Sequence, residues 1–116
     1  MDYKFINPEY IESVSGGDKE TIRELIDIFR EQVVEFTHEM KALLEKKDYY
    51  DLGLLAHKAK SSIAIIGMAD LAVMLKTFEL DAKESRNIEN YATWVARFES
   101  ETVKAVEELN EYACNL

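Results

Sequence analysis

His57 is the residue of this chain whose surroundings most favour chemistry. An imidazole changes charge near neutral pH, and its neutral form is a nucleophile. Lys60 follows one helical turn later, small side chains flank both residues, and Gly67 closes the same segment. This combination predicts a reactive histidine, although an exposed histidine on a helix is most often an ordinary surface residue.

The segment around His57 is expected to be a helix with an unusual outer face. At 100° per residue, His57 lies opposite the apolar positions, and the face around it carries little charge although 32% of all residues are charged. A glycine within this helix costs about 1 kcal/mol relative to alanine. We expect a docking surface for a partner here, unless these residues pack against a domain outside this chain. Its small and apolar members are Tyr50, Gly53, Leu54, Ala64 and Ile65.

The second histidine, His38, is expected to be a solvated surface residue. It follows Glu35 by three positions, and Glu-x-x-His is half of a di-iron carboxylate site in helical bundles. The other half is missing, because Leu54 occupies the position three residues before His57. The spacing therefore disfavours a metal site, and no metal is predicted.

Five helices are expected to position these residues. Apolar residues recur at steps of three and four, and one proline and four glycines leave little room for hairpins. Asn, Asp and Gly stand where helices would begin or end. Asn7 is predicted to cap a short helix that stops at 15–17, and Asp18 to cap a second helix that runs to about Lys47. The third helix is predicted to begin at Asp48, with Asp51 in its first turn, and to end at Gly67. A fourth helix is predicted over about 69–85, and Asn87 is predicted to cap the last one.

The short connections between these helices favour antiparallel neighbours. The sequence therefore predicts an all-α fold, an antiparallel up-down-up-down four-helix bundle with a short additional N-terminal helix across one end. The second helix is expected to project beyond its partners. A length of 116 residues suits one domain, 1–116.

Composition excludes several function classes. Fourteen Lys and Arg against twenty-three Asp and Glu give a net charge of −9, which disfavours nucleic-acid binding and docking on anionic lipid. Cys114 is the single cysteine and cannot form an internal disulfide. No apolar run is long enough to span a membrane and the first residues lack a secretion signal, so a cytoplasmic protein is expected.

The run His57-Lys58-Ala59-Lys60-Ser61-Ser62, with Gly67 ten positions after the histidine, resembles the signature of histidine-containing phosphotransfer (HPt) domains. The resemblance covers about 18–85, the phosphotransfer core, and extends loosely over the last helix. Ala59 stands where the family commonly has leucine, and Ser61 replaces a commoner glycine. Neither change removes a group that phosphotransfer needs.

The resemblance implies a phosphorelay intermediate. His57 would accept a phosphoryl group on Nε2 from a receiver-domain aspartate. Lys60 and Ser61 would contact the phosphoryl oxygens. Glu79 would accept a hydrogen bond from the Nδ1–H group of His57. Such a domain is a stoichiometric carrier rather than an enzyme. It needs no cofactor in this chain, and Mg²⁺ is expected on the partner.

The partners implied are receiver domains of a hybrid sensor histidine kinase, of a response regulator, or of both. Tyr50, Leu54, Ile65 and Met68 are predicted to make the apolar contacts to them, and the domain is expected to be a monomer. A non-catalytic interaction module with the same fold is the alternative. A free-standing protein and a domain of a larger kinase both fit the sequence.

Overall fold

The computed structural model describes residues 3–116, and helices account for most of them. Within this range there are five α-helices, one 3₁₀ turn and no strand, which confirms the predicted all-α class. The elements are α1 (Pro8–Ser15), α2 (Lys19–Glu45), α3 (Tyr49–Ile66), α4 (Ala69–Lys83), η1 (Ile88–Asn90) and α5 (Tyr91–Cys114).

Local capping sets several of the helix ends. Asn7 accepts a hydrogen bond from the backbone N–H of Tyr10 at the start of α1, and Asp18 does the same for Thr21 at the start of α2. Both caps were predicted. Gly67 ends α3 with φ at 86°, a left-handed conformation that glycine adopts without a steric penalty.

At two predicted caps the side chain makes no capping hydrogen bond. Asp48 holds the position before α3 without a capping bond from its side chain. Hydrogen bonding with the nearby Asp48 carboxyl, together with its like charge, raises the pKa of the Asp51 carboxyl. Asn87 donates its side-chain amide to Asp81 Oδ2 at 3.0 Å. The last helix therefore begins at Tyr91, after η1.

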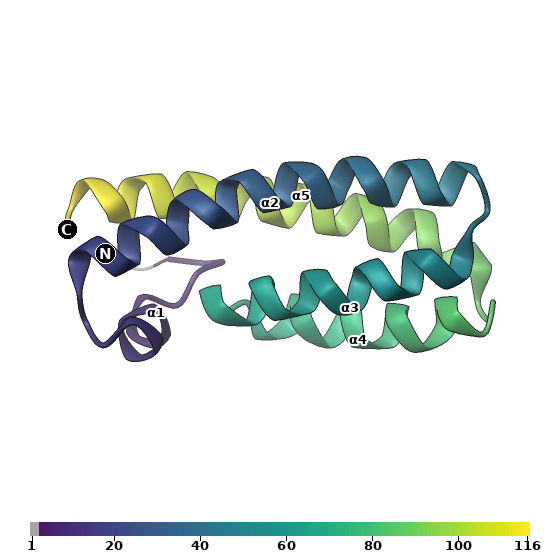
Figure 1. Cartoon of the computed structure of the whole chain (residues 1–116), viewed down its shortest axis with the longest axis horizontal. Coiled ribbons are helices and arrows are strands. Elements are labelled where there is room, and N and C mark those ends of the chain that lie inside the picture. The colour runs from purple at the N-terminus through teal and green to yellow at the C-terminus, as the bar shows by residue number, and fades with distance from the viewer. Residues whose placement is uncertain (1–2) are drawn as a thin grey trace.

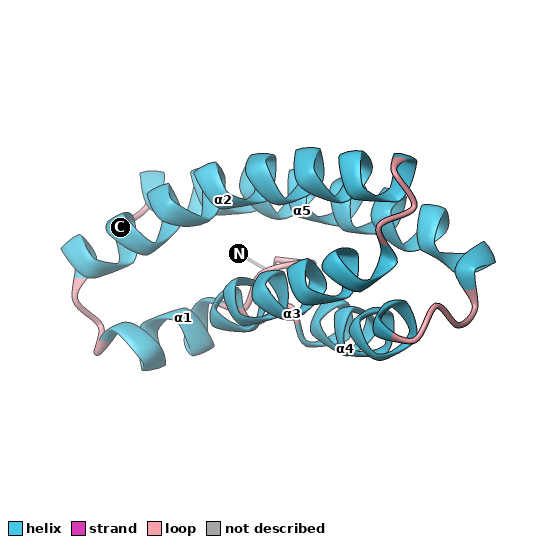
Figure 2. Ribbon diagram, turned by 45° about the vertical axis from the view of Figure 1, so that its right-hand side comes forward, coloured by secondary structure: helices cyan, strands magenta, loops and turns pink. Residues whose placement is uncertain are grey.

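The helices lie along the long axis of a body that measures 43 × 21 × 20 Å (Figure 1). α2 and α5 run side by side, and the shorter α3 and α4 form a second pair beside them. α1 lies at the end of the molecule that α3 and α4 leave free, which Figure 2 shows from another side. There it contacts α2 and α3 and buries Ile11, as expected for a short helix across one end.

Polar bonds between the helices fix their register. They join residues far apart in the sequence, and between α2 and α5 the residue numbers rise along one helix as they fall along the other. The bonds are Arg30 to Asn110 at 2.7 Å and Lys41 to Glu99 at 2.9 Å between α2 and α5, and Ser62 to Gln32 at 2.7 Å between α3 and α2.

The segment before α1 is held against α5 by one carboxylate. Glu108 accepts hydrogen bonds from the backbone N–H groups of Lys4, Phe5 and Ile6 at 2.9, 2.8 and 3.0 Å. A carboxylate can accept several bonds at once, and bonds to a charged acceptor are stronger than neutral ones. Glu108 therefore fixes this segment, and Ile6 is buried beneath it.

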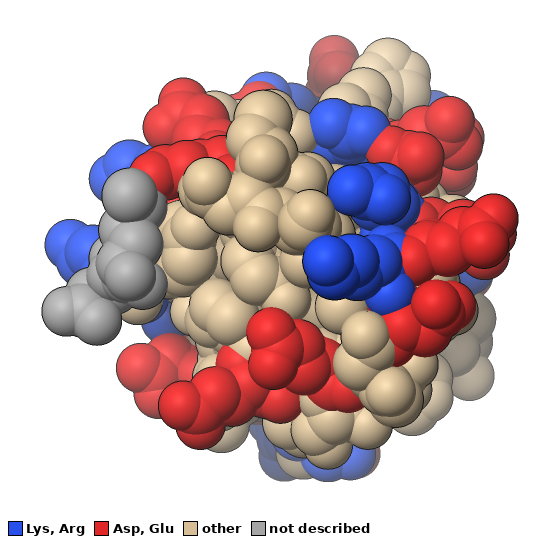
Figure 3. Space-filling model, turned by 90° about the vertical axis from the view of Figure 1, so that its left-hand side faces the viewer, with Lys and Arg blue, Asp and Glu red and all other residues tan. Residues whose placement is uncertain are grey.

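The surface carries the acidic excess of the sequence. Figure 3 shows one end of the molecule, where acidic side chains lie around an uncharged centre and a small group of basic side chains gathers on one side.

Among residues 3–116, no helix has both the length and the apolar character that crossing a bilayer requires.

Candidate functional site

His57 lies near the middle of α3 with its imidazole turned partly to solvent. Its side chain is 58% exposed, as the helical pattern predicted. The ring is fixed on one side, because Nδ1 lies 2.9 Å from Oε1 of Glu79 on α4. Within residues 3–116, Nε2 has no hydrogen-bond partner.

Glu79 is buried between α3 and α4, with only 5% of its side chain exposed. Its second oxygen, Oε2, accepts a hydrogen bond from Nζ of Lys83 at 2.9 Å. Burial alone would raise the pKa of this carboxyl. The hydrogen bonds and charges of Lys83 and His57 have the larger, opposite effect, and together they lower the pKa from its ordinary value of 4.5 to about 2. Glu79 is therefore a charged carboxylate at neutral pH, with one nitrogen at each oxygen.

This geometry selects one form of the imidazole. A neutral ring carries one proton, and a carboxylate can only accept hydrogen bonds, so the proton lies on Nδ1 when the ring pairs with Glu79. Nε2 then has a free lone pair on the exposed side. Such an arrangement can attack an electrophile without a separate base.

Lys60 and Ser61 occupy the turn of α3 that follows His57. Lys60 is half-buried and Ser61 is exposed. Lys60 takes part in none of the ion pairs between the residues that the structure describes. Its ammonium is thus available to an anion that comes close to His57.

Gly53 is not part of the exposed face, and this prediction is wrong. It is buried where α3 crosses α4, and a Cβ atom there would lie 2.9 Å from Cγ of Lys83 and 3.0 Å from the backbone oxygen of Glu79. The glycine lets the two helices approach closely at the level of the Glu79–Lys83 pair. Close packing, rather than docking, explains its presence in the helix.

The rest of the predicted docking surface is largely exposed. Tyr50, Leu54 and Ile65 are 58%, 45% and 38% exposed, and Ala64 also faces solvent. Beside Ala64 there is a hollow of about 390 Å³ that Tyr10 of α1 and Ala72 of α4 also line. This surface therefore extends from α3 onto its neighbours.

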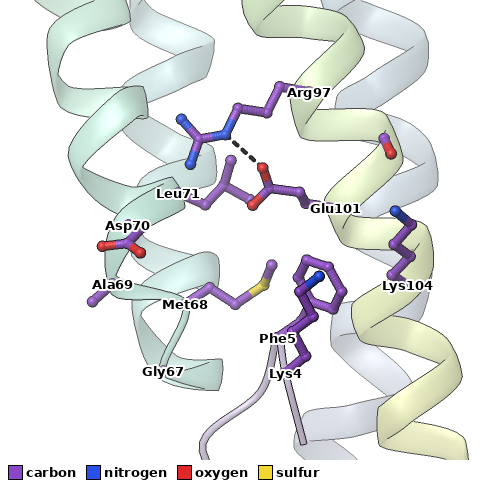
Figure 4. Close-up of a pocket in the computed structure, with 11 residues that line it drawn as sticks. Lys4, Phe5, Gly67, Met68, Ala69, Asp70, Leu71, Arg97, Glu101 and Lys104 are labelled. Carbon is purple, nitrogen blue, oxygen red and sulfur yellow. Dashed lines mark hydrogen bonds and ion pairs between the residues drawn. The ribbon is translucent and has the colours of Figure 1, made fainter.

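Met68 is the second residue that the structure removes from this surface. It is 5% exposed and belongs to the core. Its side chain lies at a separate pocket of about 610 Å³ between α4, α5 and the segment before α1 (Figure 4). Lys4 and Phe5 enter this pocket from the N-terminal segment, and none of His57, Lys60 and Glu79 lines it.

His38 is exposed, as expected for a surface residue. Residues 3–116 contain no group of three His, Cys, Asp or Glu side chains that could share a metal ion. The Glu35-x-x-His38 pattern thus remains a single pair on α2.

Lys83 is the site residue that the sequence interpretation missed. A usable signal was present, because Glu79 and Lys83 are four residues apart and residues with this spacing meet on one face of a helix. Pairs with this spacing are usually solvated, so the spacing alone does not predict a buried carboxylate. Burial of the Glu79 carboxylate depends on the packing of α4 against α3.

Three comparisons with known proteins found no matching family model, no matching curated protein and no matching solved structure.

Proposed function

We propose that this protein is a histidine phosphotransfer domain that carries a phosphoryl group on Nε2 of His57. The observation that carries the proposal is the half-exposed imidazole whose Nδ1 lies 2.9 Å from a buried, charged Glu79. That contact leaves Nε2 as the nucleophile on the exposed side. The sequence resemblance around His57 and Gly67 supports the same assignment.

The transfer begins with attack of the Nε2 lone pair on the phosphorus of an aspartyl phosphate. A P–N bond forms and the P–O bond to the aspartate breaks, and the aspartate carboxylate leaves with the electron pair. The imidazole keeps its proton on Nδ1, which donates a hydrogen bond to Glu79, and the ring gains one positive charge that the buried carboxylate offsets. The reverse reaction passes the group to the aspartate of a second receiver domain.

Lys60 would place its ammonium beside the phosphoryl oxygens and stabilise their charge in the transition state. Ser61 would add a hydrogen bond to the same oxygens. In this proposal, Mg²⁺ belongs to the partner receiver domain, and the chain described here is a stoichiometric carrier.

The finer fold assignment belongs to the same proposal. We assign α2, α3, α4 and α5 to an antiparallel up-down-up-down four-helix bundle, with α1 as the additional helix. The two bonds between α2 and α5, along which the residue numbers run in opposite directions, support the antiparallel placement of that pair. Residues 18–85 would form the phosphotransfer core.

The docking surface would consist of Tyr50, Leu54, Ala64 and Ile65 around His57. Its apolar area in a protein of net charge −9 suits a receiver domain of a hybrid sensor kinase or of a response regulator. We further propose a cytoplasmic monomer that binds these partners in turn.

The test is incubation with a receiver domain that carries labelled aspartyl phosphate. The proposal expects phosphate on this chain that is stable in alkali and labile in acid, the behaviour of a phosphohistidine. His57→Gln should abolish the label, whereas His38→Gln, the matched control on α2, should keep it. Label that persists in His57→Gln, or no label on the unmodified chain, would contradict the proposal and favour the non-catalytic module.

Lys60 is tested in the same assay. Lys60→Ala should slow transfer about tenfold or more, because one charge is removed from the phosphoryl oxygens. Lys58→Ala removes an exposed lysine from α3 on another side and should leave the rate unchanged. Equal rates for the two variants would remove Lys60 from the mechanism.

A further inference from the structure

The Glu79 carboxylate lies between two nitrogens of different kinds. Oε1 is 2.9 Å from the imidazole Nδ1 of His57, and Oε2 is 2.9 Å from the ammonium of Lys83. The ammonium carries a fixed positive charge at neutral pH, whereas the imidazole can be neutral or charged. The buried carboxylate can therefore be balanced in two ways, by Lys83 or by a protonated His57.

We propose that Lys83 is a positioning residue that balances the charge of Glu79 and so keeps His57 neutral and able to react. The inference rests on the proposed role of His57 as the phosphoryl acceptor. It assigns to Lys83 a function that no other lysine of α3 or α4 shares, since Lys83 is the only lysine among the described residues that bonds Glu79.

The reasoning follows from the cost of a buried charge. A carboxylate that is 5% exposed must be paired, because an unpaired charge in the interior is strongly unfavourable. Without Lys83, the protonated imidazole would be the only cation in contact with Glu79. An imidazolium carries protons on both nitrogens and has no lone pair with which to attack phosphorus.

The packing of α3 against α4 holds Lys83 in place. Its Cγ lies 2.9 Å from the position that a Cβ atom of residue 53 would occupy, so the lysine stem crosses α3 at Gly53. The side chain is 31% exposed, which restricts the ammonium to the neighbourhood of Glu79. The other lysines of the two helices are Lys58 and Lys60 on α3 and Lys76 on α4, and none of them bonds Glu79.

The first experiment uses phosphoramidate, a small phosphodonor, so that partner docking plays no part. Lys83→Met should be phosphorylated about tenfold more slowly than the unmodified chain at pH 7, and the difference should close toward pH 9 as the imidazole loses its extra proton. Lys83→Arg should restore the rate. Lys76→Met, the matched control, should follow the unmodified chain at every pH. Parallel profiles for Lys83→Met and the unmodified chain would overturn the inference.

The second experiment reads the ring directly by ¹⁵N NMR, without any phosphodonor. The unmodified chain should show a neutral His57 with its proton on Nδ1 at pH 8, and Lys83→Met should show a larger imidazolium fraction at the same pH. The double variant E79Q/K83M should return to the neutral ring, because both charges are gone. An unchanged ring in Lys83→Met would refute the role of Lys83, even if His57 proves not to be a phosphoryl acceptor.

Circular dichroism of each variant checks that it keeps the helicity of the unmodified chain. If Lys83→Met does not fold, E79Q/K83M and Lys83→Arg are compared in its place, since neither leaves a buried charge unpaired. The inference expects a neutral ring and efficient phosphorylation in Lys83→Arg. An imidazolium at pH 8 in that variant would contradict it.

Discussion

At the scale of single residues, the most informative group is the Glu79 carboxylate. Its folded-state pKa of about 2 lies below the ordinary value of 4.5, so its charged form stabilises the fold. That contribution is complete above about pH 4.5 and is lost as the pH falls toward 2. One side chain therefore links the charge of the site to the stability of the molecule.

Glu79→Gln should consequently lower the free energy of unfolding by about 2–3 kcal/mol at pH 7, with a smaller loss at lower pH. Urea unfolding between pH 7 and pH 2.5 measures both proteins under matched conditions. Glu35→Gln, at an exposed position of α2, is the control and should change stability little. A loss for Glu79→Gln that does not depend on pH would show that the carboxyl charge is not the cause.

The sequence was sufficient to predict the exposure of His57 but not its environment. Exposure follows from helical periodicity, which is a local property. The contact with Glu79 was expected only through the family resemblance, and Lys83 was missed. The contact between His57 and Glu79 joins α3 to α4, and the burial of the Glu79–Lys83 pair depends on the same packing. A sequence does not state how closely two helices approach.

At the scale of the helices, Gly53 determines how closely α3 approaches α4. Gly53→Ala would place a methyl group 3.0 Å from the backbone oxygen of Glu79 and 3.1 Å from the backbone nitrogen of Lys83. We expect a net loss of about 1–3 kcal/mol, because overpacking outweighs the better helix propensity of alanine. Thermal unfolding measures it, with Lys58→Ala on the same helix as a neutral control. A stabilised Gly53→Ala would contradict the close approach.

A comparison of Gly67 with Gly17 distinguishes two costs of adding a side chain at a helix end, backbone strain and steric overlap. Both have positive φ, at 86° and 77°, but a Cβ at Gly67 would lie 2.5 Å from Cβ of Asn7, whereas nothing lies within 4 Å of a Cβ at Gly17. Gly17→Ala should cost about 1–2 kcal/mol through backbone strain alone. Gly67→Ala should cost at least about 1 kcal/mol more. Equal losses in chemical denaturation would show that Asn7 moves aside freely.

The helix boundaries explain which predictions succeed at this scale. The caps at Asn7 and Asp18 are local bonds over three residues, and their prediction is confirmed. The prediction for Asn87 failed because Asp81, on the preceding helix, binds its side chain. The helical wheel placed Gly53 on the outer face because it treats the buried side of a helix as one narrow sector. α3 in fact contacts α1, α2 and α4 over a wider arc.

At the scale of the whole molecule, Glu108 joins the first residues to the last helix. Glu108→Gln keeps the shape of the side chain but loses the charge that holds three backbone N–H groups. Hydrogen exchange at Phe5 and Ile6 should become at least about fivefold faster, since bonds to a charged acceptor are the stronger ones. Glu107→Gln, at the exposed neighbouring position, should leave exchange unchanged. Unchanged exchange in Glu108→Gln would mean that packing alone holds the segment.

The two sides of the His57 ring have a consequence for the phosphotransfer that we propose. Nδ1 faces the buried Glu79, the side chain as a whole is more than half exposed, and Nε2 has no hydrogen-bond partner among residues 3–116. A phosphoryl group added at Nε2 would therefore displace no buried side chain. A partner would recognise the loaded carrier from its surface alone, and the interior of the protein would hold the same conformation before and after each transfer.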